Sequence, residues 1–213
     1  MSKLHRAIDY LSSAHKLRVL SFLAKLSDRE FHEREIARQT GISYGSANRV
    51  LNELFADGIL MRRKVGKMMF YTYNSKDPLA KAFKIFVAVS LIRPLINDLK
   101  GSASEIVLYG SCARGEDGSA SDVDLFVISN DKEKPFRTIQ SYKFEKAFEH
   151  MTIQPVILTP QELLKSEKSE KEFLSLVREG IVLWDEQIDE AGVQEMPESG
   201  EDHPFPAREK TRR

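Results

Sequence analysis

In the second half of the chain, a Gly-Ser pair follows one apolar segment and two carboxylates stand at the start of the next. Segments 105–109 and 123–128 have the length and composition of buried strands. Gly110-Ser111 interrupts this pattern directly after the first segment, and Asp122-Val123-Asp124 opens the second. Side chains two residues apart on a strand project from the same face, so we expect the two carboxylates to converge. The sequence therefore predicts a sheet that carries a paired acidic site.

Paired carboxylates of this kind indicate a binding site for a divalent cation. Like charges held so close repel each other unless a positive charge neutralises them, and hard cations such as Mg²⁺ or Mn²⁺ prefer oxygen ligands. Gly110 allows the backbone to approach a phosphate, and Ser111 offers a hydroxyl and an amide to it. Arg114 can reach a phosphate or pair instead with Glu116 or Asp117, and the sequence leaves both alternatives open.

Three short motifs in this region carry a resemblance to a known enzyme family. Gly110-Ser111, Arg114-Gly115-Glu116 and Ser121-Asp122-Val123-Asp124-Leu125 together resemble the minimal nucleotidyltransferases of the DNA polymerase beta superfamily, over about residues 100–186. The resemblance implies transfer of a nucleoside monophosphate from a nucleoside triphosphate to an acceptor hydroxyl. It implies that Asp122 and Asp124 hold the metal and are catalytic, and that Gly110, Ser111 and Arg114 bind phosphate.

One position departs from the pattern of that family. The third carboxylate of the family corresponds to Gln154, five residues before Thr159-Pro160. A neutral amide coordinates a metal weakly and takes no proton, and loss of a positioned base costs roughly 10²- to 10⁴-fold in rate. Two alternatives follow: Glu149 or Glu162 substitutes from nearby, or the site binds nucleotide and metal without catalysing transfer.

The first third of the chain predicts three short helices and a hairpin. Apolar residues at helical spacing indicate helices over 12–26, 33–40 and 43–57, with Ser43 capping the third. Gly41 permits the tight turn between the second and third helices. Strand-forming residues around Val65-Gly66 predict a hairpin that runs from about residue 60 to residue 73.

This arrangement, over about residues 10–75, resembles the winged helix-turn-helix domain of ArsR- and MarR-type transcription regulators. In that family the third helix enters the major groove of double-stranded DNA and the hairpin, or wing, contacts phosphates. The alternatives are a solvated helix surface or a protein-contact module. The resemblance places these residues towards DNA: Ser43, Tyr44, Ser46, Asn48, Arg49 and Asn52 on the helix, and Arg62, Arg63, Lys64 and Lys67 on the wing.

The charge distribution is compatible with contact between the N-terminal part and a polyanion. The chain of 213 residues has no formal net charge, but residues 1–75 hold 13 Lys and Arg against 7 Asp and Glu. The remainder holds 19 against 25, so the two parts carry +6 and −6. Charge alone does not distinguish a polyanion-binding N-terminal part from a chance distribution of charges. The motifs decide between these two explanations.

The expected organisation is two domains of mixed α+β and α/β class. We expect a winged helix over 1–75, a helical connector over 76–100 bent at Pro94, and a nucleotidyltransferase fold over 101–186 with a small mixed sheet flanked by helices. Its later elements are a helix at 135–149, a strand at 152–158, and a helix and strand within 173–184. Residues 187–213 lack an apolar period and predict a disordered tail. The connector is also the candidate contact of a homodimer.

No signal peptide and no membrane span are expected, which predicts a cytoplasmic location. Two functions remain open. The first is magnesium-dependent nucleotidyl transfer localised to DNA, for which the resemblance to minimal nucleotidyltransferases implies a protein acceptor such as a partner toxin. The second is a non-catalytic transcription regulator that uses a degenerate nucleotidyltransferase domain as a nucleotide sensor.

Overall fold

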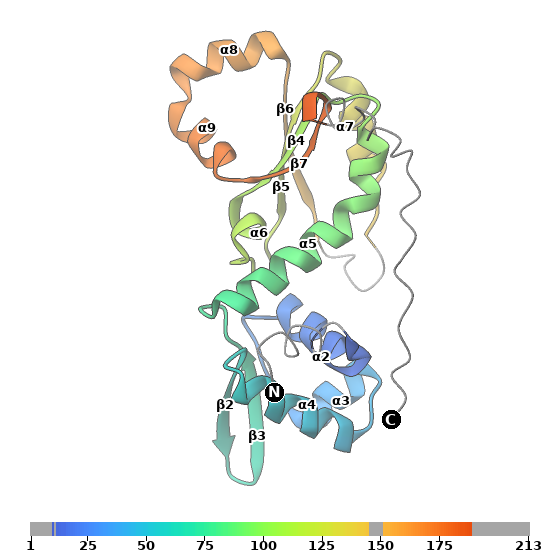
Figure 1. Cartoon of the computed structure of the whole chain (residues 1–213), viewed down its shortest axis with the longest axis vertical. Helices are drawn as coiled ribbons and strands as arrows, with labels where there is room; N and C mark the ends of the chain where they lie inside the picture. Colours follow the sequence, from blue (N-terminus) through green and yellow to red (C-terminus); the bar gives the residue numbers. More distant parts are fainter. Residues whose placement is uncertain (1–9, 11, 145–150, 189–213) are drawn as a thin grey trace, which may run out of the picture.

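The structure, a computed structural model, describes residues 10, 12–144 and 151–188. In this part of the chain two small sheets lie on either side of one long helix, α5 (Figure 1). The three-stranded sheet belongs to the N-terminal part and the four-stranded sheet to the C-terminal part. The division into two domains with a connector over 76–100 stays a prediction.

The N-terminal part contains the three helices and the hairpin that its sequence predicts. Ser13 and Ser43 accept hydrogen bonds from backbone amides and so cap the first and third helices, and Gly41 ends the second helix with a φ of 65°. In chain order the elements are α2 (Ala14–Lys25), β1 (Glu30–His32), α3 (Glu33–Thr40), α4 (Tyr44–Ala56), β2 (Leu60–Val65) and β3 (Met68–Tyr73).

The short strand β1 was not predicted. It pairs antiparallel with β3, so that Phe31 lies opposite Tyr71, and the sheet order becomes β1-β3-β2. Phe31 and Tyr71 are both buried in the core that the three helices share. A segment of three residues with one apolar side chain is too short to show the two-residue hydrophobic period of a strand, so its sequence does not predict β1. Pairing with β3, about forty residues away, gives the segment its strand geometry.

The helix α5 (Pro78–Leu99) belongs to both cores. Asp77 caps it, and Pro78 occupies the first helical turn, where no backbone amide hydrogen bond is lost. Ala80 packs in the N-terminal core, whereas Ile92 and Leu99 pack against the four-stranded sheet. Figure 1 shows the helix changing direction along its length, and Pro94 lies within it, as the sequence predicts.

The C-terminal part is a mixed sheet with helices on both faces, which matches the expected fold class. The order is β6-β5-β4-β7, with β5 and β6 parallel and the other pairs antiparallel. The elements are β4 (Glu105–Tyr109), α6 (Gly110–Arg114), β5 (Val123–Ile128), α7 (Glu133–Ser141), β6 (Ile153–Leu158), α8 (Pro160–Ser169), α9 (Lys171–Arg178) and β7 (Ile181–Asp185).

Alternation along the strands divides the side chains of this sheet between two cores. Leu125 and Val127 of β5 face α5 and α7, whereas Phe126 and Ile128 face the opposite side, where Leu174 of α9 covers them. Figure 1 shows α5 and α7 on one side of the sheet and α8 and α9 on the other. Residues 125–128 of β5 are therefore apolar on both faces, which explains why no polar residue interrupts this run.

The expected strands at 105–109 and 123–128 are confirmed residue for residue. The helix expected at 135–149 begins at Glu133 and ends at Ser141, and residues 145–150 lie outside the described part. Helix α8 was not predicted. The tail expected at 187–213 lies outside the described residues from 189 onward. Among the helices described, none is both long enough and apolar enough to cross a membrane.

Candidate active site

Gly110 and Asp124 are in direct contact at the end of β4. Gly110 has a φ of +72°, which glycine adopts without strain, and a Cβ at this position would lie 2.0 Å from Oδ2 of Asp124. Ser111 follows, partly exposed, in the short helix α6. The glycine in the Gly-Ser pair is therefore required for two reasons, its backbone conformation and the space that the Asp124 carboxylate occupies.

Asp122 immediately precedes β5 and is held by two side chains of the neighbouring region. Thr152 donates a hydrogen bond to Oδ1 of Asp122, and Gln154 Nε2 lies 3.5 Å from Oδ2, at the long limit for such a bond. Sequence reasoning missed Thr152. The position of Thr152 two residues before Gln154 could have predicted its role, because side chains two residues apart at the start of a strand lie on the same face.

Asp124 and Gln154 form a matched pair in the parallel register of β5 and β6. The pKa of Asp124 is raised above its ordinary value, first by burial and then by the negative charge of Asp122, while Arg114 acts in the opposite direction. Two carboxylates thus converge as the sequence predicts, and their mutual repulsion disfavours the doubly charged state. A cation between them removes this penalty.

Residues 90–179 match the family model of the nucleotidyltransferase domain. The matched region includes both carboxylates, the Gly-Ser pair and Gln154, and the match supports nucleotidyl transfer as the general activity of this part of the chain. No curated protein matches the chain.

Arg114 of the matched region pairs with Glu116, one of the two acidic partners that the sequence left open. Its Nε lies 2.9 Å from Oε2 of Glu116, and Nζ of Lys81 in α5 lies 2.6 Å from the other carboxylate oxygen. Hydrogen bonds from Lys81 and Arg114 lower the pKa of Glu116 to about 2. About half of the Arg114 side chain is exposed, so the pair is weak enough for Arg114 to turn towards a phosphate.

Glu162 does not replace the third carboxylate. It lies in α8, after the far end of β6, where it accepts hydrogen bonds from Lys132 and from the backbone amide of Thr159 in a capping box. These bonds lower its pKa to about 2. Because β5 and β6 are parallel, Thr159 lies at the opposite end of the sheet from Asp122. Glu149, the other candidate, lies outside the described residues.

The donors of the site suit a hard cation. Asp122 and Asp124 supply carboxylate oxygens, and the amide oxygen of Gln154 is a weaker ligand of the same type. Over residues 10, 12–144 and 151–188, no group of three or more His, Cys, Asp or Glu side chains could hold a metal ion. A cation here would therefore depend on these two carboxylates, with its remaining ligands supplied by triphosphate and water.

Cys112 is buried beside the site and packs in the core. Burial raises the pKa of its thiol to about 12, and the thiol donates to the backbone oxygen of Asp122 at 3.4 Å. The thiol stays protonated near neutral pH, which fits a structural residue and not a nucleophile.

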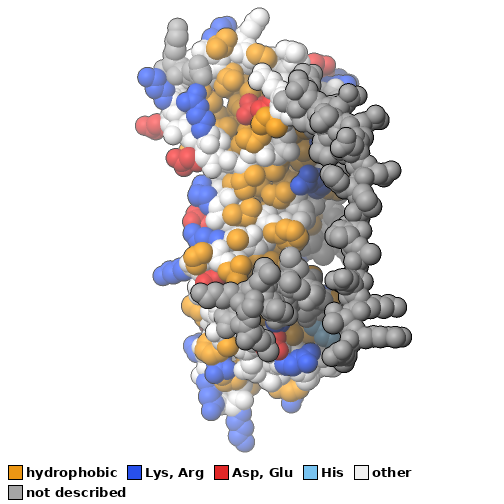
Figure 2. All heavy atoms as spheres, viewed as in Figure 1, with side chains coloured by type: hydrophobic (Ala, Val, Ile, Leu, Met, Phe, Trp, Pro, Cys, Tyr) orange, Lys and Arg blue, Asp and Glu red, His pale blue; other side chains and the backbone are white. Residues whose placement is uncertain are grey.

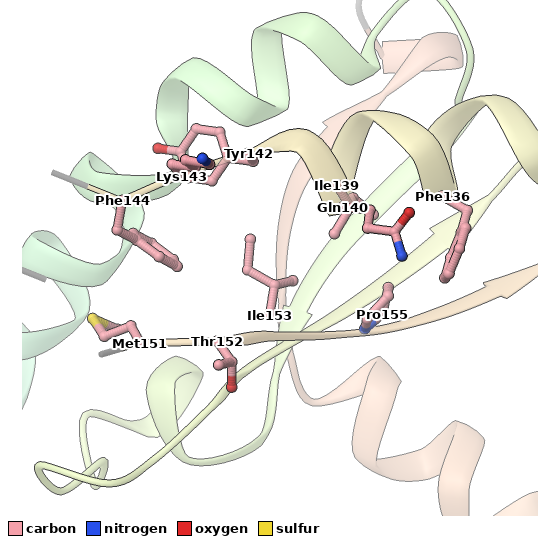
Figure 3. Close-up of a pocket in the computed structure, with 10 residues that line it drawn as sticks. All are labelled: Phe136, Ile139, Gln140, Tyr142, Lys143, Phe144, Met151, Thr152, Ile153 and Pro155. Atoms are coloured by element: carbon pink, nitrogen blue, oxygen red, sulfur yellow. The ribbon is translucent and has the colours of Figure 1, made fainter. Parts of the chain in front are cut away.

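A large cavity lies on the other face of the sheet. Its volume is about 810 Å³, and Figure 3 shows Ile153 and Pro155 of β6 pointing towards Phe136 and Ile139 of α7 across it. Thr152 points away from these side chains, towards the side where it contacts Asp122. Apart from Thr152, the lining is separate from the acidic pair, so cavity size alone does not locate the site.

The residues that sequence analysis places towards DNA lie together around α4 and β2. Ser43 and Ser46 bond to each other at the start of α4, and Arg49 is exposed. Tyr44 and Asn48 both donate to the carboxylate of Glu33 in α3, at 2.6 and 3.0 Å. Glu33 was not predicted, and it places a negative charge between two residues that the resemblance places towards DNA.

The basic side chains of the hairpin divide into two pairs. Arg62 stacks over the Phe55 ring at 3.9 Å and donates to Asn52, and Arg63 lies 2.6 Å from Glu30. Lys64 and Lys67 are exposed, and neither forms an ion pair with another described residue. Figure 2 shows Lys and Arg side chains at the end of this hairpin.

Proposed function

We propose that the protein is a magnesium-dependent nucleotidyltransferase. The observation that carries the proposal is the convergence of Asp122 and Asp124 beside Gly110, within the region that matches the nucleotidyltransferase domain. The acceptor hydroxyl oxygen attacks the α-phosphorus of a nucleoside triphosphate, a new P–O bond forms, and the bond to the β-phosphate breaks to release pyrophosphate. The nucleoside monophosphate remains on the acceptor.

Each residue of the site has a separate task in this reaction. A bound Mg²⁺ or Mn²⁺ would neutralise the triphosphate and stabilise the charge that develops on attacking and leaving oxygens. Asp122 and Asp124 would hold the ion, and the hydrogen bond from Thr152 orients Asp122. Gly110 keeps the approach to the carboxylates open, and Arg114 would exchange Glu116 for a phosphate.

Among the residues that the structure describes, the proposed site lacks a side chain that could remove the proton of the acceptor hydroxyl. Gln154 occupies the position beside Asp124 and takes no proton, so the acceptor hydroxyl loses its proton to solvent or to the nucleotide. We therefore expect a rate roughly 10²- to 10⁴-fold below that of a comparable site with a positioned base.

A transfer assay tests the proposal. The chain is incubated with labelled nucleoside triphosphates, Mg²⁺ and a panel of protein and nucleic-acid acceptors, of which a partner toxin is the first protein. The wild-type chain should transfer label, and the Asp122→Ala/Asp124→Ala double variant should not. Asp98→Ala, which removes an exposed carboxylate of α5, is the matched control. Absence of transfer by the wild type over the whole panel would refute the enzymatic proposal.

A second candidate function is a non-catalytic nucleotide sensor that changes DNA affinity. The observation that favours it is Gln154, a neutral amide where the family pattern has a carboxylate. By thermodynamic reciprocity, operator DNA would then change nucleotide affinity by the same factor by which nucleotide changes DNA affinity. Calorimetric titration of Mg²⁺ and nucleotide with and without DNA tests this, and identical dissociation constants would contradict it.

For both functions we propose that the N-terminal part is a winged helix that binds double-stranded DNA. The arrangement α2, α3, α4 and the β2–β3 hairpin supports this assignment, as does the cluster of exposed basic side chains on the hairpin. Selection of preferred duplexes from a random pool tests it. Recovery of no sequence motif would favour a protein-contact module instead.

We propose further that two copies pair through α5. Leu79 and Phe86 are each about half exposed on this helix, and Figure 2 shows hydrophobic side chains gathered over the middle of the face. Two-fold pairing would place two α4 helices on successive half-sites of DNA. Sedimentation of the wild type and of Phe86→Glu tests this, because the variant should be monomeric at concentrations where the wild type is dimeric.

A further inference from the structure

The loop that leads into Asp122 rests on the N-terminal part of the chain. It runs from Gly115, after α6, to Ser121, and it joins the Gly-Ser pair to the first carboxylate. Ser27, which follows α2, donates from Oγ to the backbone oxygen of Asp117 at 3.2 Å. Asp28 accepts a hydrogen bond from the hydroxyl of Ser119 at 2.8 Å. Both contacts join residues about 90 positions apart in the sequence.

A buried lysine completes this contact. Lys84 of α5 has only 1% of its side chain exposed, and its Nζ lies 3.3 Å from Oδ1 of Asp117. The same ammonium group donates to Ser27 Oγ at 3.1 Å and to the backbone oxygen of Asp117. Desolvation raises the pKa of Asp117 and the charge of Lys84 opposes this rise. A buried ammonium group needs such partners, because an unpaired charge in this position is costly.

The base of the loop is equally constrained. Gly115 has a φ of +64°, and a Cβ there would lie 2.4 Å from the backbone oxygen of Lys81 in α5. Within the loop the amide of Gly118 donates to Ser121 Oγ at 2.8 Å, one residue before Asp122. The loop therefore has fixed contacts near each end and in its middle, and those in the middle come from Ser27, Asp28 and Lys84.

We propose that Ser27, Asp28 and Lys84 are positioning residues that fix the 115–121 loop and thereby the carboxylate of Asp122. On this view the metal and nucleotide site is complete only when the N-terminal part is docked on the loop. The inference rests on the proposed nucleotidyl transfer for its consequence, because the contacts matter for chemistry only if Asp122 holds the metal. None of the three residues touches the acidic pair, and their effect passes through the loop.

The Ser27→Ala/Asp28→Ala double variant tests the inference with little risk to folding. It removes two hydrogen bonds to the loop and the bond that Ser27 accepts from Lys84, but it leaves the Lys84 and Asp117 charges paired. Lys84→Met would instead leave a buried carboxylate alone. Each lost bond is worth about a 2- to 10-fold change in a local equilibrium. Because two bonds are lost, we expect amide hydrogen exchange over 116–121 to accelerate by about 4- to 100-fold.

The functional readout is the Mg²⁺ concentration that gives half-maximal nucleotide binding and half-maximal transfer. In the double variant it should rise several-fold, with the apparent KM for the acceptor unchanged and the melting temperature close to that of the wild type. The Ser27→Ala/Asp28→Asn variant, which keeps an acceptor oxygen for Ser119, should recover part of the loss. Glu53→Gln is the matched control, because it removes the Lys16–Glu53 ion pair of the N-terminal part without touching the loop.

The outcomes separate this inference from the proposed function. Unchanged amide exchange over 116–121 would overturn the inference, and so would faster exchange with an unchanged Mg²⁺ requirement in a wild type that binds nucleotide. If the wild type binds no nucleotide with Mg²⁺, the proposed function fails, and the positioning role fails with it even where the exchange data show that the loop is held.

Discussion

Asp124 and Gln154 lie side by side on the parallel strands β5 and β6. Gln154 also directs its amide towards Asp122, so one neutral side chain faces both carboxylates of the candidate site. A carboxylate in its place would add a third negative charge and a base. The identity of this residue therefore decides whether the acidic pair only binds a metal and nucleotide or also deprotonates an acceptor.

Replacement of Gln154 by Asp should increase transfer, because it supplies the missing base. We expect a gain of roughly 10²-fold or more, within the roughly 10²- to 10⁴-fold range of general base catalysis. The third carboxylate should also lower the melting temperature without Mg²⁺, by repulsion, and make Mg²⁺ more stabilising. Gln154→Asn is the control. Equal transfer rates for the wild type and Gln154→Asp would mean that another group takes the proton.

Gly110→Ala should abolish nucleotide binding. A Cβ at Gly110 would meet the Asp124 carboxylate at 2.0 Å, and the left-handed backbone conformation costs a non-glycine residue about 1–3 kcal/mol. Thermal unfolding should therefore show a loss of about this size or more, and calorimetry with Mg²⁺ and nucleotide should show no binding. Gly101→Ala, where nothing lies within 4 Å of the added Cβ, should leave both quantities near the wild-type values.

Lys64 and Lys67 should contribute to DNA affinity without contributing to sequence preference. If they contact phosphates, each Lys→Ala change should flatten the log-log dependence of the binding constant on salt by about 0.9. Asn48→Ala should instead cost about 1–3 kcal/mol on the preferred duplex and little on random DNA. Fluorescence anisotropy over a salt series measures both effects, with Lys171→Ala in α9 as the control. Unchanged slopes in both lysine variants would remove the hairpin from the DNA interface.

The capping box at Glu162 should stabilise the fold in a pH-dependent way. The pKa of Glu162 is about 2 in the folded chain, against about 4.5 for an ordinary glutamate. The folded state therefore favours the ionised form, so the contribution is fully present above about pH 4.5 and is lost as the pH falls towards 2. Urea midpoints of the wild type and Glu162→Gln should differ at pH 6 and converge near pH 2.

Glu133→Gln is the control for that series. Its pair with Arg137 connects two side chains that are more than three-quarters exposed, so the urea midpoint should change little at any pH. A Glu162→Gln midpoint equal to that of the wild type at pH 6 would show that the capping box adds no stability.

Local sequence determined most of the secondary structure. Segments 105–109 and 123–128 are apolar except at Glu105 and Asp124 because helices cover both faces of the sheet, so the composition itself marks the strands. Ser43 and Asp77 mark helix starts because a cap involves only a few neighbouring residues. The convergence of Asp122 and Asp124 follows from the two-residue period of a strand, and it too could be predicted without the fold.

Tertiary structure decided the contacts that join distant segments. The pairing of Phe31 with Tyr71, the hydrogen bond from Thr152 to Asp122 and the burial of Lys84 against Asp117 each connect residues between about 30 and 40 positions apart. No local pattern specifies which distant side chain becomes the neighbour, because this depends on how strands and helices pack as whole elements. The sequence alone identified the acidic pair and Gln154, and packing determined which residues hold that pair in place.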